Sequence, residues 1–209
     1  MFSADLLRLH LCLTMAVLLA LASCAATSPA REARHIGLDK IPSLLLQESE
    51  APAGTRQIRS AWAARGQFAD GDDELSARWR DLGFEDGWIT LFASSTDSTD
   101  PTTLTIANGA MVFPTSDAAS RALQAHRAVG VPKLTKGSVA TQVSGIGDEA
   151  FAFTYEHGPL GPPGAICAFR VANVMFLVPG SGIGAKVEEL IAIARKIADR
   201  ALRVAVGPT

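Results

Sequence analysis

The segment AICAFRVANVMFLV, residues 165–178, decides the fold because it contains two apolar strands and the turn that joins them. Side chains of a strand alternate between its two faces, so Cys167 lies on the same face as Phe169 and Val171. Residues 174–178 form the second strand, and Ala172-Asn173 suits a tight turn. Consecutive strands joined by so short a turn pair in the antiparallel sense. The sequence therefore predicts an antiparallel sheet around this hairpin.

Working outward from the hairpin, period-two patterns predict four more strands, at residues 88–93, 103–113, 138–143 and 150–156. Apolar residues at helical spacing predict helices at residues 41–47, 74–82, 117–129 and 185–202. Asp72 or Asp73 is predicted to cap the helix at residues 74–82, and Gly83 to end it. Ser116 is predicted to cap the helix at residues 117–129. The fold class that follows is α+β, a curved and mainly antiparallel sheet of about six strands with helices packed on one face.

The chain begins with the layout of an export signal. A positive group at Arg8 precedes an apolar run at residues 11–22. Twelve residues are fewer than the ~20 that a membrane-spanning helix needs. Leu21-Ala22-Ser23-Cys24 resembles the bacterial lipobox, which implies a diacylglycerol thioether on Cys24 and cleavage just before it. The alternatives are an ordinary signal peptide cut nearby and an apolar helix that is never removed.

The lipobox resemblance divides the chain into three parts. Residues 1–23 form a lipoprotein signal peptide, residues 24–37 a flexible tether without hydrophobic periodicity, and residues 38–209 a single extracytoplasmic domain. The acyl chains on Cys24 make the membrane a partner. The anchor then lies in the cell membrane or the outer membrane, with the domain facing away from the cytoplasm. Ala25 favours the outer membrane where there is one, because lipoproteins retained at the inner membrane usually have aspartate at this position.

Charge excludes one class of partner. The chain has 19 basic and 21 acidic residues, a net charge of −2, and the removal of Asp5 and Arg8 with the signal leaves that charge unchanged. Without a basic excess the chain has no means of neutralising a phosphate backbone, so we expect no nucleic-acid partner.

The reactive residue types are scattered. Cys12 leaves with the signal and Cys24 is modified, so Cys167 has no internal disulfide partner and is predicted to be buried. The histidines at 35, 126 and 157 lack metal-ligand spacing, so we expect no metal and no cofactor. In a strand the adjacent Asp148 and Glu149 would point to opposite faces and could not act as a carboxylate pair. Residues 145–149 are predicted instead to form a turn that leads into the strand at residue 150. No catalytic residue is predicted.

Four short segments resemble those of known extracytoplasmic proteins. Leu44-Leu-Leu with Pro52-Ala-Gly54, Phe113-Pro-Thr-Ser-Asp-Ala-Ala119, Gly145-Ile-Gly-Asp-Glu-Ala-Phe151 and Phe169-Arg-Val-Ala-Asn-Val-Met175 resemble LpqN-like lipoproteins and the extracellular domain of PknH-like kinases. The resemblance implies a binding or sensing domain with a sheet-lined cleft and no catalytic set. The paired disulfides of some relatives are absent from this sequence.

The function that these observations predict is a lipid-anchored extracytoplasmic module of the bacterial cell envelope that binds or senses a ligand or an envelope protein and is not an enzyme. Two alternatives from other classes stay open. One is a hydrolase or transferase acting on envelope polymers through His157 and a nearby acid. The other is a structural protein that spaces envelope components.

Overall fold

The computed structural model describes residues 34–69, 71–95, 103–134, 137–156, 162–182 and 184–205. These residues belong to one compact unit, Ala33–Thr209. The predicted signal peptide, Cys24 and His157 lie outside the described residues.

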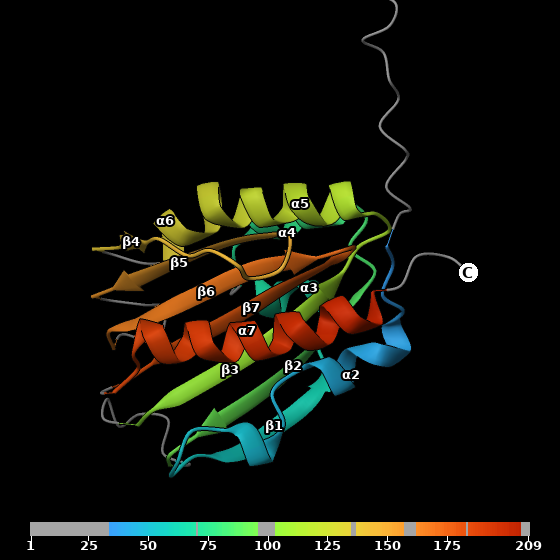
Figure 1. The fold of residues 1–209 in the computed structure, drawn as a ribbon. Helices are drawn as coiled ribbons and strands as arrows, with labels where there is room; N and C mark the ends of the chain where they lie inside the picture. Colours follow the sequence, from blue (N-terminus) through green and yellow to red (C-terminus); the bar gives the residue numbers. More distant parts are fainter. Residues whose placement is uncertain are drawn as a thin grey trace, which may run out of the picture. The chain divides into compact units, whose positions relative to one another are not determined.

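A seven-stranded antiparallel sheet forms the centre of the unit (Figure 1). Its spatial order is β1-β2-β3-β7-β6-β5-β4. The strands are β1 Arg56–Trp62, β2 Asp86–Ala93, β3 Thr105–Val112, β4 Val139–Thr141, β5 Glu149–Tyr155, β6 Gly164–Val171 and β7 Val174–Ser181. The quoted hairpin supplies β6 and β7, so it lies near the middle of the sheet, and β7 joins it to β3.

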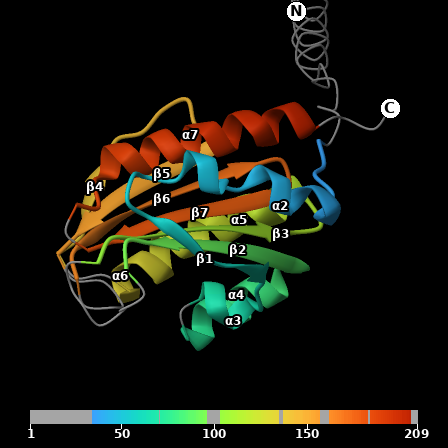
Figure 2. The ribbon, with the colours of Figure 1, turned by 90° about the horizontal axis from the view of Figure 1, so that it is seen from below.

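Helices cover both faces of this sheet, as Figure 2 shows with α7 on one side and α3 and α4 on the other. The helical elements are η1 Leu38–Lys40, α2 Ile41–Leu44, η2 Glu48–Glu50, α3 Arg65–Phe68, α4 Asp73–Asp81, α5 Ser116–Ala125, the π turn η3 His126–Gly130, α6 Val131–Leu134 and α7 Val187–Val204. The α7 face is the face packed under α7 and α2, and the α4–α5 face is the opposite one.

The hairpin divides its side chains between these two faces. Cys167, Phe169 and Phe176 are fully buried on the α7 face, where the two phenylalanine rings stack with centroids 4.9 Å apart. Ala168 and Met175 are fully buried on the α4–α5 face. Both faces of the central strands are therefore core, which explains why the hairpin is so apolar along its whole length.

The α+β class and the antiparallel sheet predicted from the sequence are confirmed. Asp72 caps α4 by accepting a hydrogen bond from the Leu75 N–H, at 2.8 Å, and Gly83 follows the helix with φ of 80°. The Ala172-Asn173 turn forms as predicted, with Ala172 in the left-handed region at φ of 52°. These features come from local patterns that neighbouring residues alone determine.

Three details of the predicted fold are corrected. The sheet has seven strands instead of about six. The additional strand is β1, whose sequence shows no apolar alternation because six of its seven residues are exposed. Helices pack on both faces instead of one, since α4 and α5 bury their apolar sides on the face opposite α7. Thr115, not Ser116, caps α5, and its hydroxyl accepts from the Ala118 N–H at 3.1 Å.

Residues 34–37, predicted as the end of the tether, are part of the packed unit. Ile36 is fully buried in the core of the α7 face. Its N–H donates to Asn173 Oδ1 at 2.8 Å, and its carbonyl accepts from Asn173 Nδ2 at 3.3 Å. The folded body thus begins at least four residues before the predicted boundary. None of the helices in the described part of the chain has the length and apolar character that a membrane span requires.

Candidate functional site

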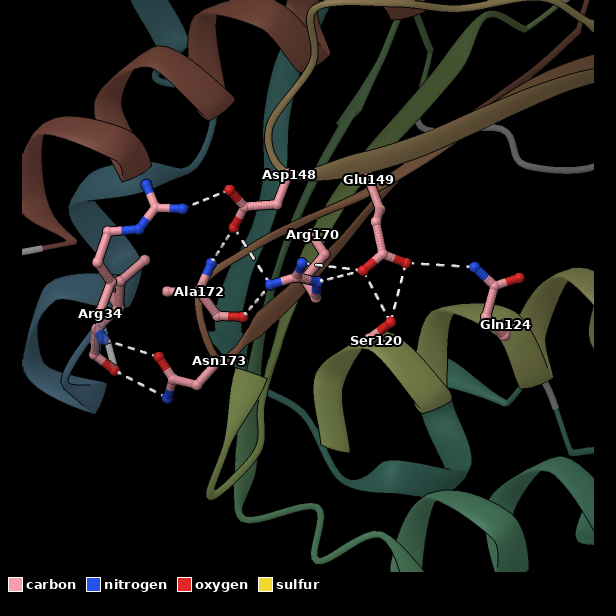
Figure 3. A network of polar contacts seen from close by, with 9 residues as sticks. Arg34, Ser120, Gln124, Asp148, Glu149, Arg170, Ala172 and Asn173 are labelled. Carbon is pink, nitrogen blue, oxygen red and sulfur yellow. Dashed lines mark hydrogen bonds and ion pairs between the residues drawn. The ribbon is translucent and has the colours of Figure 1, made fainter. Parts of the chain in front are cut away.

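A network of charged side chains surrounds Arg170 of β6 (Figure 3). The Arg170 guanidinium donates to Glu149 Oε1 from Nε at 3.0 Å, and to Asp148 Oδ2 and the Ala172 carbonyl from Nη1 at 3.2 and 2.9 Å. Its side chain is only 13% exposed. One mostly buried cation therefore bridges two adjacent carboxylates.

The turn predicted at residues 145–149 is present at residues 145–148, and it brings Asp148 and Glu149 to the same guanidinium group. Strand β5 begins at Glu149, and Asp148 belongs to the preceding turn, in which Gly145 and Gly147 have φ of 69° and 57°. The turn breaks the strand alternation, so both carboxylates reach Arg170 (Figure 3). At Gly147 a side chain would also meet the Arg170 carbonyl, so the close approach requires glycine.

These contacts hold both carboxylates in their charged forms. Burial favours the neutral form of Asp148, but hydrogen bonds from the Ala172 N–H and Arg34 and the charge of Arg170 outweigh it and lower the pKa. Burial likewise opposes ionisation of Glu149, and hydrogen bonds from Ser120 and Arg170 lower its pKa overall. Carboxylates that are already paired and ionised are poor proton donors at neutral pH.

The network connects four parts of the fold. On one side Ser120 and Gln124 of α5 donate to Glu149, at 2.8 and 3.2 Å from the nearer oxygens. On the other side Arg34 pairs with Asp148. We name this set the Arg170 clamp: it comprises Arg34, Ser120, Gln124, Asp148, Glu149 and Arg170 (Figure 3). The clamp fixes the start of the folded body, at Arg34, to the end of the sheet at the β6–β7 turn.

The other reactive side chains within the described ranges are sequestered or isolated. Cys167 is fully buried, as predicted, and burial raises the pKa of its thiol to about 12. His126 is 2% exposed, and burial lowers the pKa of its imidazole to about 4. His35 is exposed in the segment before η1. No catalytic combination forms from these three residues, because they lie on different elements and two of them are shielded from solvent.

A second feature, on the α4–α5 face, is a row of half-buried apolar side chains that crosses five strands. From β5 to β2 the row consists of Phe153, Ile166, Pro179, Ala107 and Leu91. In the strand registers each of these residues lies opposite the next one. All five side chains are half-buried. We name them the apolar row. Arg59 of β1 lies opposite Leu91, so an exposed guanidinium group ends the row.

The neighbouring row lies one step closer to the β6–β7 turn and is more deeply buried. It consists of Phe151, Ala168, Leu177 and Gly109, which are buried, and Ile89, which is half-buried. The Phe68 ring of α3 packs so closely on Gly109 that a Cβ there would lie 2.6 Å from it.

The helical cover of this face comes from two places. Helix α4 has 9 residues, about 14 Å at 1.5 Å per residue. Helix α5, the π turn η3 and α6 follow one another without a break from Ser116 to Leu134, and Figure 2 shows α6 on the same side of the sheet as α3 and α4.

Sequence reasoning missed both features. Phe153 and Ile166 lie within correctly predicted strands, but alternation does not show which face a helix covers. Strand β7 is predicted to end at residue 178, whereas it continues through Pro179 to Ser181, although proline is rare in a central strand. Arg170 alternates with apolar neighbours and so has the pattern of a solvent-facing residue, although it is mostly buried.

Comparison with known proteins supports the architecture. A solved structure, the extracellular domain of PknH from Mycobacterium tuberculosis, is similar with a TM-score of 0.60 and 17% sequence identity. The match covers 82% of this chain and 99% of that domain. No family model matches the chain, and no curated protein matches it in sequence. The predicted resemblance to PknH-type extracellular domains is confirmed as a likeness of fold, and the resemblance to LpqN-like lipoproteins stays a prediction.

Proposed function

We propose that this chain is a lipid-anchored, extracytoplasmic binding module of the bacterial cell envelope, and that it is not an enzyme. The observation that carries the proposal is the order of its parts: Leu21-Ala22-Ser23-Cys24 precedes a body whose fold is similar to an extracellular domain. An acyl-modified Cys24 holds the body to the membrane.

The Arg170 clamp gives this anchor a defined attachment point. From Cys24 to Arg34 the chain spans ten peptide units, which reach at most about 35 Å. Arg34 pairs with Asp148, and Ile36 is bound to Asn173, so the body begins as soon as this short connection ends. In this proposal the β6–β7 end of the sheet stays within that distance of the membrane surface.

The non-enzymatic part of the proposal is supported by the state of the reactive groups. The Cys167 thiol and the His126 imidazole are buried, and the carboxylates of Asp148 and Glu149 are paired with Arg170. The apolar row consists of partly exposed side chains that carry no reactive group.

The proposal is tested by expressing the full chain in a bacterial host that is fed radiolabelled palmitate. We expect the wild-type chain to carry label and to sediment with membranes, and Cys24→Ala to lose both. Cys12→Ala, which changes a cysteine within the signal, is the matched control and keeps the label. Label retained in Cys24→Ala, or an unlabelled wild-type chain, would contradict the anchor.

Protease added to intact cells or spheroplasts tests the side of the membrane. Cleavage of the wild-type chain without lysis supports an extracytoplasmic body. Protection in spheroplasts until they are lysed would place the body in the cytoplasm and overturn the proposal.

A further inference from the structure

We propose that the apolar row binds a single acyl chain whose anionic headgroup is held by Arg59 and Arg56. This inference deepens the proposed function and rests on it, since it gives the binding module a class of ligand. The row runs from Phe153 on β5 to Leu91 on β2, and Arg59 on β1 stands at its end.

The dimensions of the row suit an extended hydrocarbon chain. Between Phe153 and Arg59 lie five strand spacings, or about 24 Å at 4.8 Å each. An acyl chain in a membrane fills half of a hydrocarbon core of about 30 Å, or about 15 Å. The row can therefore accommodate such a chain and still leave room for a headgroup beside β1.

The chemistry of the row favours hydrocarbon over polypeptide. Its five side chains are apolar, and each lies on a strand that has neighbours on both sides, so its backbone groups serve the sheet. Pro179 has no backbone N–H at all. A polypeptide laid across these strands would leave its own N–H and C=O groups without partners, at a cost of several kcal/mol, whereas an acyl chain has none to satisfy.

The charge beside the row favours an anionic headgroup. Residues 51–69 contain Arg56, Arg59 and Arg65 and no acidic residue, although the whole chain has a net charge of −2. In the strand register Arg56 lies opposite Ala93 and Arg59 opposite Leu91, which places both arginines on the same face as the row. Among the described residues, neither Arg56 nor Arg59 forms an ion pair.

Arg65 differs from these two arginines, because its Nε already donates to Ser76 Oγ at 3.2 Å. Arg56 and Arg59 are exposed, and their guanidinium groups can make charge-assisted hydrogen bonds with a phosphate. The arrangement is amphipathic in the same sense as a lysophospholipid, with an apolar row leading to a pair of cations.

The inference is tested with two lipids that differ only in headgroup charge. The protein is the chain of residues 24–209 with Cys24→Ala, which contains the whole compact unit. Palmitoyl-lysophosphatidylglycerol is anionic, and palmitoyl-lysophosphatidylcholine is zwitterionic. Below their micelle concentrations, native mass spectrometry counts the bound molecules and calorimetry measures affinity. We expect one molecule of the anionic lipid per chain, and affinity for the zwitterionic lipid about tenfold weaker.

Two pairs of variants separate the headgroup from the acyl chain. Arg59→Gln is expected to reduce the preference for the anionic lipid about fivefold or more, and Arg203→Gln, an exposed arginine on α7, leaves it unchanged. Leu91→Gln is expected to weaken both lipids alike, and Leu202→Gln, on α7, neither. Ala107→Glu places a carboxylate at the centre of the row and is a second test if Leu91→Gln folds poorly.

Three results would overturn the inference: no binding of the anionic lipid, equal affinity for the two headgroups, or equal effects of Arg59→Gln and Arg203→Gln. Its failure is distinct from failure of the proposed function. If Cys24 is lipidated and no lysolipid binds, only the ligand class is wrong. If the anionic lipid binds to the row and Cys24 is unmodified, the anchor is wrong and the binding site stands.

Discussion

His126 makes the folded protein sensitive to acid in a way that one substitution isolates. Its imidazole lies between the rings of Trp79 and Phe151, with centroids 5.9 and 6.1 Å away. Within the described residues neither ring nitrogen has a hydrogen-bond partner. Burial lowers the pKa of His126 from 6.5 to about 4, so the folded state disfavours the imidazolium.

The size of the effect follows from the two pKa values. Because the folded pKa is the lower one, the stabilising contribution is fully present above pH 6.5 and is lost as the pH falls through about 4. One pKa unit corresponds to about 1.36 kcal/mol. Near pH 4.5 the loss in the free energy of unfolding is therefore about 2.5 kcal/mol, a large share of the total for a domain of this size.

His126→Leu removes the titrating group and keeps an apolar side chain of similar volume. We expect this variant to be at least as stable as the wild-type chain at neutral pH, because the two unpaired ring nitrogens are removed with it. Between neutral pH and about pH 4.5 it should lose about 2.5 kcal/mol less stability than the wild-type chain.

Urea unfolding at both pH values, followed by circular dichroism, measures this difference. The carboxylates of Asp148 and Glu149 also lose stabilisation in acid, but they are present in both proteins and cancel from the comparison. His35→Leu, at an exposed position, is the matched control and should follow the wild-type chain. Equal acid losses in His126→Leu and the wild-type chain would refute the reasoning.

Two further predictions concern the charged and polar contacts near the β6–β7 turn. Arg170→Met leaves Glu149 without its cation and should lower the free energy of unfolding, measured in urea, by about 3 kcal/mol. The control Arg203→Met, on the exposed side of α7, should change it by less than about 0.5 kcal/mol. Similar losses in both variants would contradict the structural role of the Arg170 clamp. Asn173→Ala removes the hydrogen-bond partners of the Ile36 N–H and of the carbonyls of Ile36 and Phe113. The variant should therefore lose about 2 kcal/mol or more in the free energy of unfolding, and amide hydrogen exchange at Ile36 should be faster. Unchanged exchange at Ile36 would show that other contacts hold this segment.

Local patterns in the sequence predicted a large part of this fold. The hairpin of β6 and β7 follows from alternation and a two-residue turn, and α4 follows from a cap, an apolar stripe and a terminal glycine. The burial of Cys167 follows from its place in the same alternation. In each case the residues that decide the structure are close in sequence, so propensity and tertiary packing agree.

The parts that could not be predicted depend on residues far apart in sequence. Arg34 and Asp148 are 114 positions apart, and nothing in either segment indicates the other. Strand β1 shows no alternation, because it lies at the edge of the sheet and is covered on neither face. The joint binding of Asp148 and Glu149 to Arg170 depends on how the turn at residues 145–148 packs against β6, about twenty positions later, and no local pattern indicates that contact.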